Sequence, residues 1–220
     1  MPYQFFDSLF SADPEVRIAI NASQAIRIDE TRDVDGKKKP LSNLSYVDIT
    51  LPSSAFAIRH DENFHAKRIF SNVKGYQSKN DYFIVAKTNL GIELFIVELK
   101  SRCYRKSKVK NQLLSGVAMV SYCIRLGIDR TKDVAGFGMV KIYAIVLTNT
   151  ISDFSGTGIR ANKDIAKYIK ACGTASGVMC VNGHTATLED LRTHAIPVTF
   201  DGLKSNDLDV IPPYPGTGDI

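Results

Sequence analysis

The chain has 220 residues, of which 44% are hydrophobic, and it carries a formal net charge of +5 at pH 7. This length and hydrophobic content are sufficient for one domain with a substantial core. No apolar run approaches the roughly 20 residues that a helix needs to span a bilayer, and the N-terminus lacks the pattern of a signal peptide. We therefore expect a single cytoplasmic domain over residues 1–220, whose basic surplus is compatible with a polyanionic partner.

The four cysteines are scattered through the chain, without a Cys-x-x-Cys pair or histidines at matching spacing. They are Cys103, Cys123, Cys172 and Cys180. This distribution is typical of neither a zinc site nor a disulfide framework. We expect reduced, intracellular thiols.

The first third of the chain gives mixed signals for secondary structure. Residues 1–30 combine the apolar alternation of a strand with the Asp-Pro-Glu start of a helix, so their type stays open. Residues 31–43 contain a glycine, a proline and three consecutive lysines, which predicts a solvated loop. Residues 46–51 alternate like a strand, and residues 53–70 allow a helix.

The clearest pattern is a β-hairpin between Asp81 and Lys100. Two apolar runs flank a Thr-Asn-Leu-Gly connection at residues 88–91. Since side chains alternate along a strand, one face of the second run carries three apolar residues followed by Glu98 and Lys100. Burying a charge is costly unless the charge is paired or bound to a metal, so these two residues need an explanation.

After the hairpin, the pattern predicts a helix and a further buried strand. From about Ser107 to Ile124, apolar residues recur every three or four positions, and Gly127 supplies the predicted end of the helix. Residues 141–149 form a continuous apolar run of the kind found in strands that are buried on both faces. The order strand, helix, strand implies a right-handed crossover and a parallel pair of strands.

The C-terminal part predicts shorter elements. Residues 161–172 have the periodicity of an amphipathic helix, and residues 178–186 contain an Asn-Gly dipeptide that predicts a second hairpin. Residues 195–201 favour an edge strand, because an internal proline removes a ladder donor. The tail at residues 206–220 is rich in Pro and Gly, which predicts irregular structure.

The acidic residues of the first hairpin predict a metal site. Asp81 begins one strand and Glu98 ends the next, so they should face each other across an antiparallel pair. Two carboxylates without His or Cys favour Mg²⁺ or Mn²⁺, which would orient a water and neutralise charge on a phosphate. Lys100, on the same face as Glu98, could position that water or stabilise the transition state.

A basic run follows the acid pair directly and suggests the substrate. The basic residues that follow Lys100 are Arg102, Arg105, Lys106, Lys108 and Lys110. Such a run is either a solvated segment or a set of phosphate contacts, and its place beside a candidate metal site favours contacts with nucleic acid. His60 and His65 are five residues apart, which fits no ligand spacing on a helix, so we expect both to face solvent.

These residues together resemble the PD-(D/E)xK phosphodiesterase superfamily, which includes restriction endonucleases and Holliday-junction resolvases. The family pattern is an acid at the start of one strand, acid-x-Lys at the end of the next, and a helix with Gln or Lys. Asp81, Glu98-Leu99-Lys100 and Gln112 match it in order and in type, and the resemblance covers residues 61–149. It implies an α/β fold with a mixed central β-sheet flanked by helices.

The resemblance also implies a domain plan. An αβββαβ core would occupy about residues 54–150, a C-terminal elaboration about residues 151–205, and the irregular tail the rest. Two departures from the family pattern occur. Asn80 stands where the name-giving proline would be, and the acid of the first helix is not evident, with Glu62 as the candidate.

The function that the resemblance implies is an Mg²⁺- or Mn²⁺-dependent DNA endonuclease or exonuclease, compatible with a homodimer. Asp81, Glu98 and the Leu99 backbone carbonyl would bind the metal, Lys100 would act with the catalytic base, and Gln112 would orient the substrate. An inactive nuclease-fold protein that binds nucleic acid or serves assembly is the alternative. A scaffold with a structural ion network at these residues is a further one.

Overall fold

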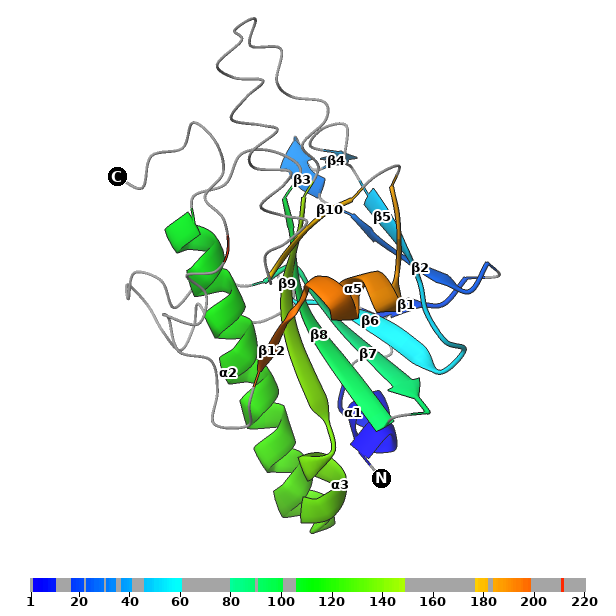
Figure 1. The fold of residues 1–220 in the computed structure, drawn as a ribbon, viewed down its shortest axis with the longest axis vertical. Helices are drawn as coiled ribbons and strands as arrows, with labels where there is room; N and C mark the ends of the chain where they lie inside the picture. Colours follow the sequence, from blue (N-terminus) through cyan, green and yellow to red (C-terminus); the bar gives the residue numbers. More distant parts are fainter. Residues whose placement is uncertain are drawn as a thin grey trace, which may run out of the picture.

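The structure is an α/β protein with two open mixed β-sheets, a small hairpin and a few helices (Figure 1). The computed structural model describes residues 2–10, 17–21, 23–29, 31–34, 37–40, 46–60, 80–89, 91–100, 106–148, 177–181, 184–198 and 211. No helix in these ranges is both long and apolar enough to cross a membrane.

The larger sheet has seven strands in the order β1-β6-β7-β8-β9-β10, and β12 also pairs with β9. Its strands are β1 (Arg17–Ala19), β6 (Ala55–Arg59), β7 (Tyr82–Thr88), β8 (Gly91–Lys100), β9 (Lys141–Thr148), β10 (Val178–Cys180) and β12 (Ile196–Val198). Strand β7 is antiparallel to both of its neighbours, β6 and β8, whereas β9 is parallel to β8.

In the described ranges, the other elements are a three-stranded sheet, a hairpin and four helices. The three-stranded sheet has the order β11-β5-β2, and β3 and β4 form the hairpin. These strands are β2 (Ala25–Asp29), β3 (Thr31–Val34), β4 (Lys37–Pro40), β5 (Tyr46–Thr50) and β11 (Thr185–Thr187). The helices are α1 (Pro2–Leu9), α2 (Lys106–Thr131), α3 (Val134–Gly138) and α5 (Leu188–His194).

The two faces of the seven-stranded sheet are covered by different layers (Figure 1). Leu94 and Ile96 of β8 lie in one core cluster with apolar residues of α2, and Phe6 of α1 joins the same cluster. On the opposite face, Phe95 and Val97 pack in a second cluster with residues of the three-stranded sheet and of α5. Glu98, two residues after Ile96, therefore lies on the face that α2 covers.

Two glycines let α2 approach its neighbours closely. A Cβ on Gly116 would lie 2.4 Å from Ile96 Cγ2 and 2.5 Å from Asn80 Oδ1, and a Cβ on Gly127 would lie 2.2 Å from Phe137 Cζ. The prediction that the helix ends at Gly127 is wrong, because α2 continues to Thr131. The missing side chain of Gly127 leaves room for the ring of Phe137 in α3, and Gly127 does not terminate the helix.

The central hairpin and the crossover agree with the sequence pattern. Tyr82 pairs with Val97 and Thr88 pairs with Gly91, so β7 and β8 form the expected antiparallel hairpin. The predicted parallel pair is confirmed, since β8 and β9 are in parallel register along their length. Strand β12 confirms the predicted edge strand, and its Pro197 is exposed.

Three predicted elements are wrong. Residues 31–43 contain the hairpin β3–β4 where a loop was expected, and residues 55–59 form strand β6 where a helix was expected. Residues 178–186 do not form a hairpin, because β10 pairs with β9 in one sheet and β11 pairs with β5 in the other. The helix predicted at residues 161–172 lies outside the described residues.

Helix α5 has a clear local signal that the sequence interpretation missed. The Thr187 side chain accepts a hydrogen bond from the Asp190 backbone N–H, and the Asp190 side chain accepts one from the Thr187 backbone N–H. This reciprocal capping box satisfies two donors at the start of the helix. Hydrogen bonds that the Thr187 hydroxyl and backbone N–H donate to the Asp190 carboxylate lower its pKa.

Candidate active site

The candidate site begins with a row of three polar residues across β6, β7 and β8. Arg59 pairs with Tyr82, and Tyr82 pairs with Val97. His60 directly follows β6 and Asp81 directly precedes β7, so one further step of this register places both beside Glu98 of β8 at the same end of the sheet. The His60 backbone N–H donates to the Asp81 backbone carbonyl at 2.9 Å, which continues the ladder to this row.

The Asp81 carboxylate is tied to the end of β8. Its Oδ2 accepts a hydrogen bond from the Leu99 backbone N–H at 2.7 Å. In a strand, the N–H and C=O of one residue point to the same side. The Leu99 carbonyl therefore points toward the side of β8 on which Asp81 lies, which brings carboxylate and carbonyl oxygens to one place.

Glu98 is a fully buried acid, and Lys100 compensates its charge. The Glu98 side chain is 0% exposed and forms an ion pair with the Lys100 ammonium, whose side chain is 15% exposed. A buried carboxylate without a counter-charge would be strongly destabilising. The two charges at the end of an otherwise apolar face are thus mutually neutralised at the protein interior.

Helix α2 places Gln112 over the same end of the sheet. Gln112 is buried, with 8% of its surface exposed, and it lies one turn before Gly116. Gly116 contacts Ile96 and Asn80. Since α2 runs antiparallel to β8 and rises about 6 Å per four residues, Gln112 lies toward Glu98.

His60 and Asn80 form a buried polar pair at the edge of the row. His60 Nδ1 and Asn80 Oδ1 are 2.7 Å apart, and Asn80 Nδ2 donates to the Tyr82 backbone carbonyl at 2.7 Å. The His60 ring also packs on Phe83, with ring centroids 4.6 Å apart. The expectation that His60 faces solvent is wrong, because it is only 7% exposed. His65 lies outside the described residues.

A network of three side chains holds the smaller sheet against β6 and β7 beside this row. The Tyr82 hydroxyl donates to Asp29 Oδ1 at 2.7 Å, and the Arg59 guanidinium forms an ion pair with the same carboxylate. Burial, the largest cause, raises the pKa of Tyr82 far above its usual value. Tyr82 directly follows Asp81, so this network fixes the backbone at the start of β7.

The basic run is described only in part. Helix α2 begins at Lys106, and its first residues include Lys108 and Lys110 but no acid in the first turn. Lys108 is exposed, whereas Lys106 and Lys110 are half-buried. Positive side chains at a helix N-terminus oppose the helix dipole, and a bound anion would relieve this repulsion. Arg102, Arg105 and the candidate acid Glu62 lie outside the described residues.

The ligand set in the described ranges is small. No group of three or more His, Cys, Asp or Glu side chains in this part of the chain could hold a metal ion together. The pair of carboxylates, Asp81 and Glu98, is the acidic set at the end of the hairpin.

Comparison of the chain with protein-family models, curated proteins and solved structures gives no match.

The sequence interpretation missed Thr148 at the end of β9. Thr148 is the register partner of Lys100 across the parallel pair of strands. It is fully buried, and its hydroxyl has no hydrogen-bond partner within the described part of the chain. A threonine that ends a long apolar strand is the signal that could have identified it.

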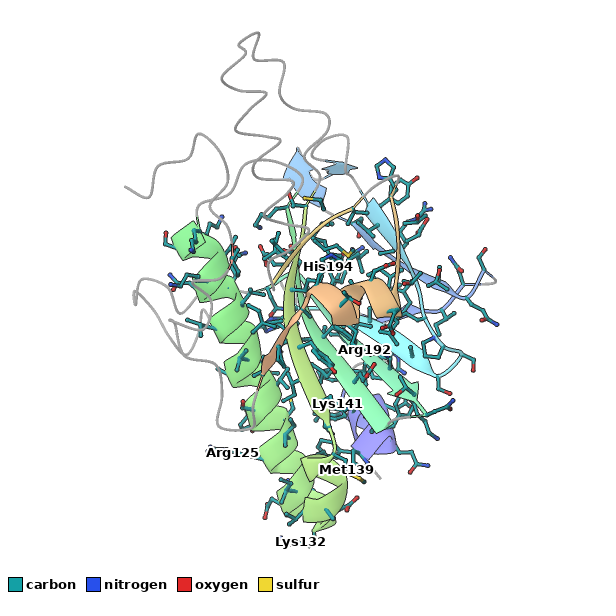
Figure 2. All side chains as sticks on the ribbon, viewed as in Figure 1. Arg125, Lys132, Met139, Lys141, Arg192 and His194 are labelled. Atoms are coloured by element: carbon teal, nitrogen blue, oxygen red, sulfur yellow. The ribbon has the colours of Figure 1, made fainter. Side chains whose placement is uncertain are left out.

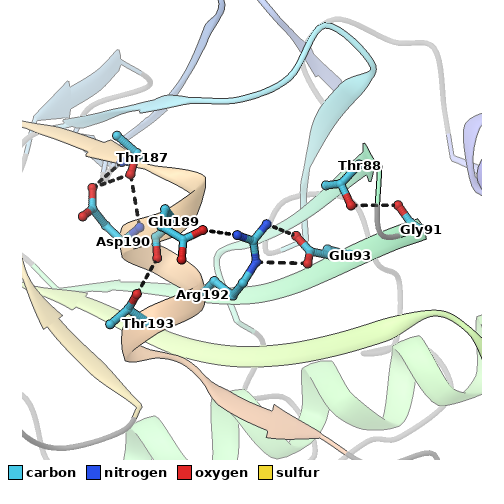
Figure 3. Close-up of polar contacts among 8 residues, drawn as sticks. All are labelled: Thr88, Gly91, Glu93, Thr187, Glu189, Asp190, Arg192 and Thr193. Atoms are coloured by element: carbon cyan, nitrogen blue, oxygen red, sulfur yellow. Dashed lines mark hydrogen bonds and ion pairs between the residues drawn. The ribbon is translucent and has the colours of Figure 1, made fainter.

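A second buried acid, Glu93, lies at the other end of β8. Its carboxylate accepts two hydrogen bonds from Arg192 of α5, at 3.0 and 2.8 Å, and Arg192 also pairs with Glu189 (Figure 3). The hydrogen bonds to Glu93 are the main cause of a raised pKa at Arg192. Glu93 is fully buried. This pair attaches α5 to the sheet, and Glu189 of the same helix extends it.

A surface hollow near the far end of α2 is separate from the acid row. It has a volume of about 300 Å³ and is lined by Arg125, Ile128, Asp129, Lys132 and Val134. Figure 2 shows Arg125 and Lys132 toward the end of α2 that lies nearest α3. Arg125 is 13 residues after Gln112, which corresponds to about 20 Å along the helix. The hollow therefore does not belong to the candidate site.

Proposed function

We propose that this protein is a metal-dependent nuclease that hydrolyses phosphodiester bonds in DNA. The observation that carries the proposal is the position of Asp81, directly before β7, beside Glu98 of the neighbouring strand β8, with Lys100 two residues later on the same face. Carboxylates at neighbouring positions of a sheet repel each other unless a cation lies between or beside them.

The oxygen atoms at this point suit a hard divalent cation. Asp81 and Glu98 would bind it through carboxylates and Leu99 through its backbone carbonyl, which is a ligand set that Mg²⁺ and Mn²⁺ prefer. When bound, such a cation supplies an oriented, more acidic water and neutralises charge that develops on the phosphate.

The residues around the acids have distinct roles in this proposal. Lys100 places a positive charge beside the reacting phosphate, where it stabilises negative charge in the transition state. Gln112, from the helix above, orients the substrate or the attacking water through its amide. The lysines that begin α2 contact phosphates of the DNA backbone, which positions the strand without reading its sequence.

The topology supports the same proposal. Among the described elements, the chain order is the antiparallel strands β6, β7 and β8, then helix α2 with the short α3 after it, then β9 parallel to β8. This is the βββαβ part of the core that the PD-(D/E)xK resemblance implies, with the acids at the strand ends where that pattern requires them. Fold alone does not select a reaction, so the argument rests on the acid row.

Two substitutions test the proposal. Glu98→Gln keeps the shape of the side chain but removes the charge, and Lys100→Met keeps the aliphatic stem but removes the ammonium. We expect each to lower Mg²⁺-dependent cleavage of DNA by at least about 100-fold, the usual cost of removing one group that stabilises transition-state charge. Lys87→Met, at an exposed position near the hairpin turn, is the matched control and should cleave like the wild type.

The outcomes separate the nuclease from its alternatives. Cleavage that persists in both site variants would rule out this site. Wild-type protein that binds DNA in a salt-sensitive way, with no turnover in Mg²⁺ or Mn²⁺, would instead identify an inactive nuclease-fold binding module. A large loss of stability on removing Glu98, without metal binding by the wild type, would indicate a structural ion network.

A further inference from the structure

We propose that Thr148 is a positioning residue. Its hydroxyl would accept a hydrogen bond from the Lys100 ammonium when Glu98 binds a metal ion. In this inference, which rests on the proposed function, the Glu98–Lys100 ion pair is the metal-free resting state. With a metal ion bound to Glu98, Lys100 would instead donate a hydrogen bond to Thr148, and this contact would hold the ammonium at the site.

The strand register brings the two side chains together. Lys100 and Thr148 are direct partners in the parallel pair of β8 and β9. Residues of neighbouring strands are about 4.8 Å apart, and partnered side chains point to the same face. That face is the one covered by α2, since Val146, two residues before Thr148, lies in the same core cluster as Ile96. The flexible four-carbon stem of lysine can therefore reach the hydroxyl without backbone movement.

The state of the Thr148 hydroxyl points to a second conformation of the site. Thr148 is 0% exposed, and its Oγ1 has no hydrogen-bond partner in the part of the chain that the structure describes. Buried hydroxyls are nearly always hydrogen-bonded, because an unsatisfied one is destabilising. Valine has the same shape and would avoid this cost. A threonine here is explained if its hydroxyl accepts a hydrogen bond in another state.

Lys100 is the donor that lies beside this acceptor. In the structure its ammonium pairs with the Glu98 carboxylate. When Glu98 binds a divalent cation, its charge is compensated there, and the nearby positive charge repels the ammonium. Thr148 Oγ1 offers two acceptor lone pairs next to it. Lys100 would then remain at the site, held beside the acids without blocking them.

Two variants of Thr148 test the exchange, and two measurements on protein without DNA avoid reliance on activity. In the metal-free protein, Thr148→Val should raise the melting temperature by about 2–4 °C, because it removes an unsatisfied buried hydroxyl. Titration with Mn²⁺ should show affinity about 3- to 10-fold weaker in the same variant, the equivalent of one lost hydrogen bond. Thr148→Ser keeps the hydroxyl and should restore Mn²⁺ affinity.

Cleavage assays and a matched control complete the test. Thr148→Val should lower kcat for Mg²⁺-dependent cleavage with little change in the KM for DNA, and Thr148→Ser should recover it. Thr50→Val, at an exposed position at the end of β5, should leave Mn²⁺ affinity unchanged. This control shows whether a Thr-to-Val change has effects that are unrelated to the buried site.

Each result bears on either the exchange or the site as a whole. Wild-type protein that binds Mn²⁺ and cleaves, with Thr148→Val unchanged in both, overturns the exchange but leaves the nuclease intact. Thr148→Ser that behaves like Thr148→Val overturns it as well, since the hydroxyl would then not be the cause. Wild-type protein that neither binds Mn²⁺ nor cleaves overturns both the exchange and the proposed function.

Discussion

Substitution of Gly116 by alanine would test how closely α2 must approach the end of the sheet. The new Cβ would lie 2.4 Å from Ile96 Cγ2 and 2.5 Å from Asn80 Oδ1, whereas ordinary contacts are 3.4–4 Å. Neither neighbour can yield easily, because Ile96 is fully buried and Asn80 is held by hydrogen bonds to His60 and Tyr82. The helix must therefore move outward by about 1 Å.

The expected cost follows from two opposing effects. Overpacking a core costs about 1–3 kcal/mol, and the better helix propensity of alanine returns up to about 1 kcal/mol. The net loss in the free energy of unfolding should be about 1–2 kcal/mol. For a chain of this size, that lowers the melting temperature by about 2–8 °C, which circular dichroism would detect on heating.

Two further glycine variants serve as controls. Gly127→Ala produces a comparable clash with Phe137, but it lies 11 residues further along the same helix, about 16 Å from Gly116. Gly138→Ala meets no atom within 4 Å. We expect Gly116→Ala and Gly127→Ala to be similarly destabilised and Gly138→Ala to match the wild type. Only Gly116→Ala should also lose Mg²⁺-dependent cleavage, because it displaces Gln112 and Asn80.

Two results would refute this reasoning. If Gly116→Ala is as stable as Gly138→Ala, α2 does not contact the sheet as closely as the structure describes. If Gly116→Ala and Gly127→Ala lose cleavage to the same degree, the reacting site does not lie below the first half of α2.

Two other predictions concern buried ionisable groups. Arg192→Met leaves Glu93 buried without its partner and should lower the free energy of unfolding by about 3 kcal/mol. This value is the lower end of the range for breaking a buried ion pair, because 27% of the Arg192 side chain is exposed. A change of less than about 0.5 kcal/mol in urea unfolding would contradict this prediction. Burial raises the pKa of the Cys123 thiol to about 11. At pH 8, alkylation of Cys123 should therefore be at least about 100-fold slower in native than in denatured protein, which peptide mass spectrometry would measure. The stability that this raised pKa contributes is fully present below about pH 8.5 and is lost as the pH rises through about 11. Equal alkylation rates in native and denatured protein would show that Cys123 is not buried.

Some of the candidate site could be predicted because it depends on one local hairpin. The alternation from Ile92 to Lys100 places Glu98 and Lys100 on one face, and an antiparallel hairpin brings Asp81 beside Glu98. Thr148 could not be assigned in this way. Its proximity to Lys100 depends on the register between β8 and β9, which lie on either side of a 26-residue helix.

Local signals failed where distant partners decided the structure. Residues 55–59 are apolar enough for a helix or a strand, and they form β6 because β7 offers its edge to them. The Asn-Gly dipeptide at residues 182–183 is typical of a hairpin turn, yet β10 and β11 on either side of it enter two different sheets. In both cases, pairing with a remote strand outweighs the local preference.

The sequence by itself determined the elements whose apolar period is long and unambiguous, namely the β7–β8 hairpin, helix α2 and strand β9. Periodicity reports which face of an element is buried, because burial of apolar surface is the main driving force of folding. It does not report against which partner that face is buried. Only the tertiary structure decided the strand order, the place of His60 beside Asp81 and Glu98, and the attachment of α5 through Arg192 and Glu93, which are 99 residues apart.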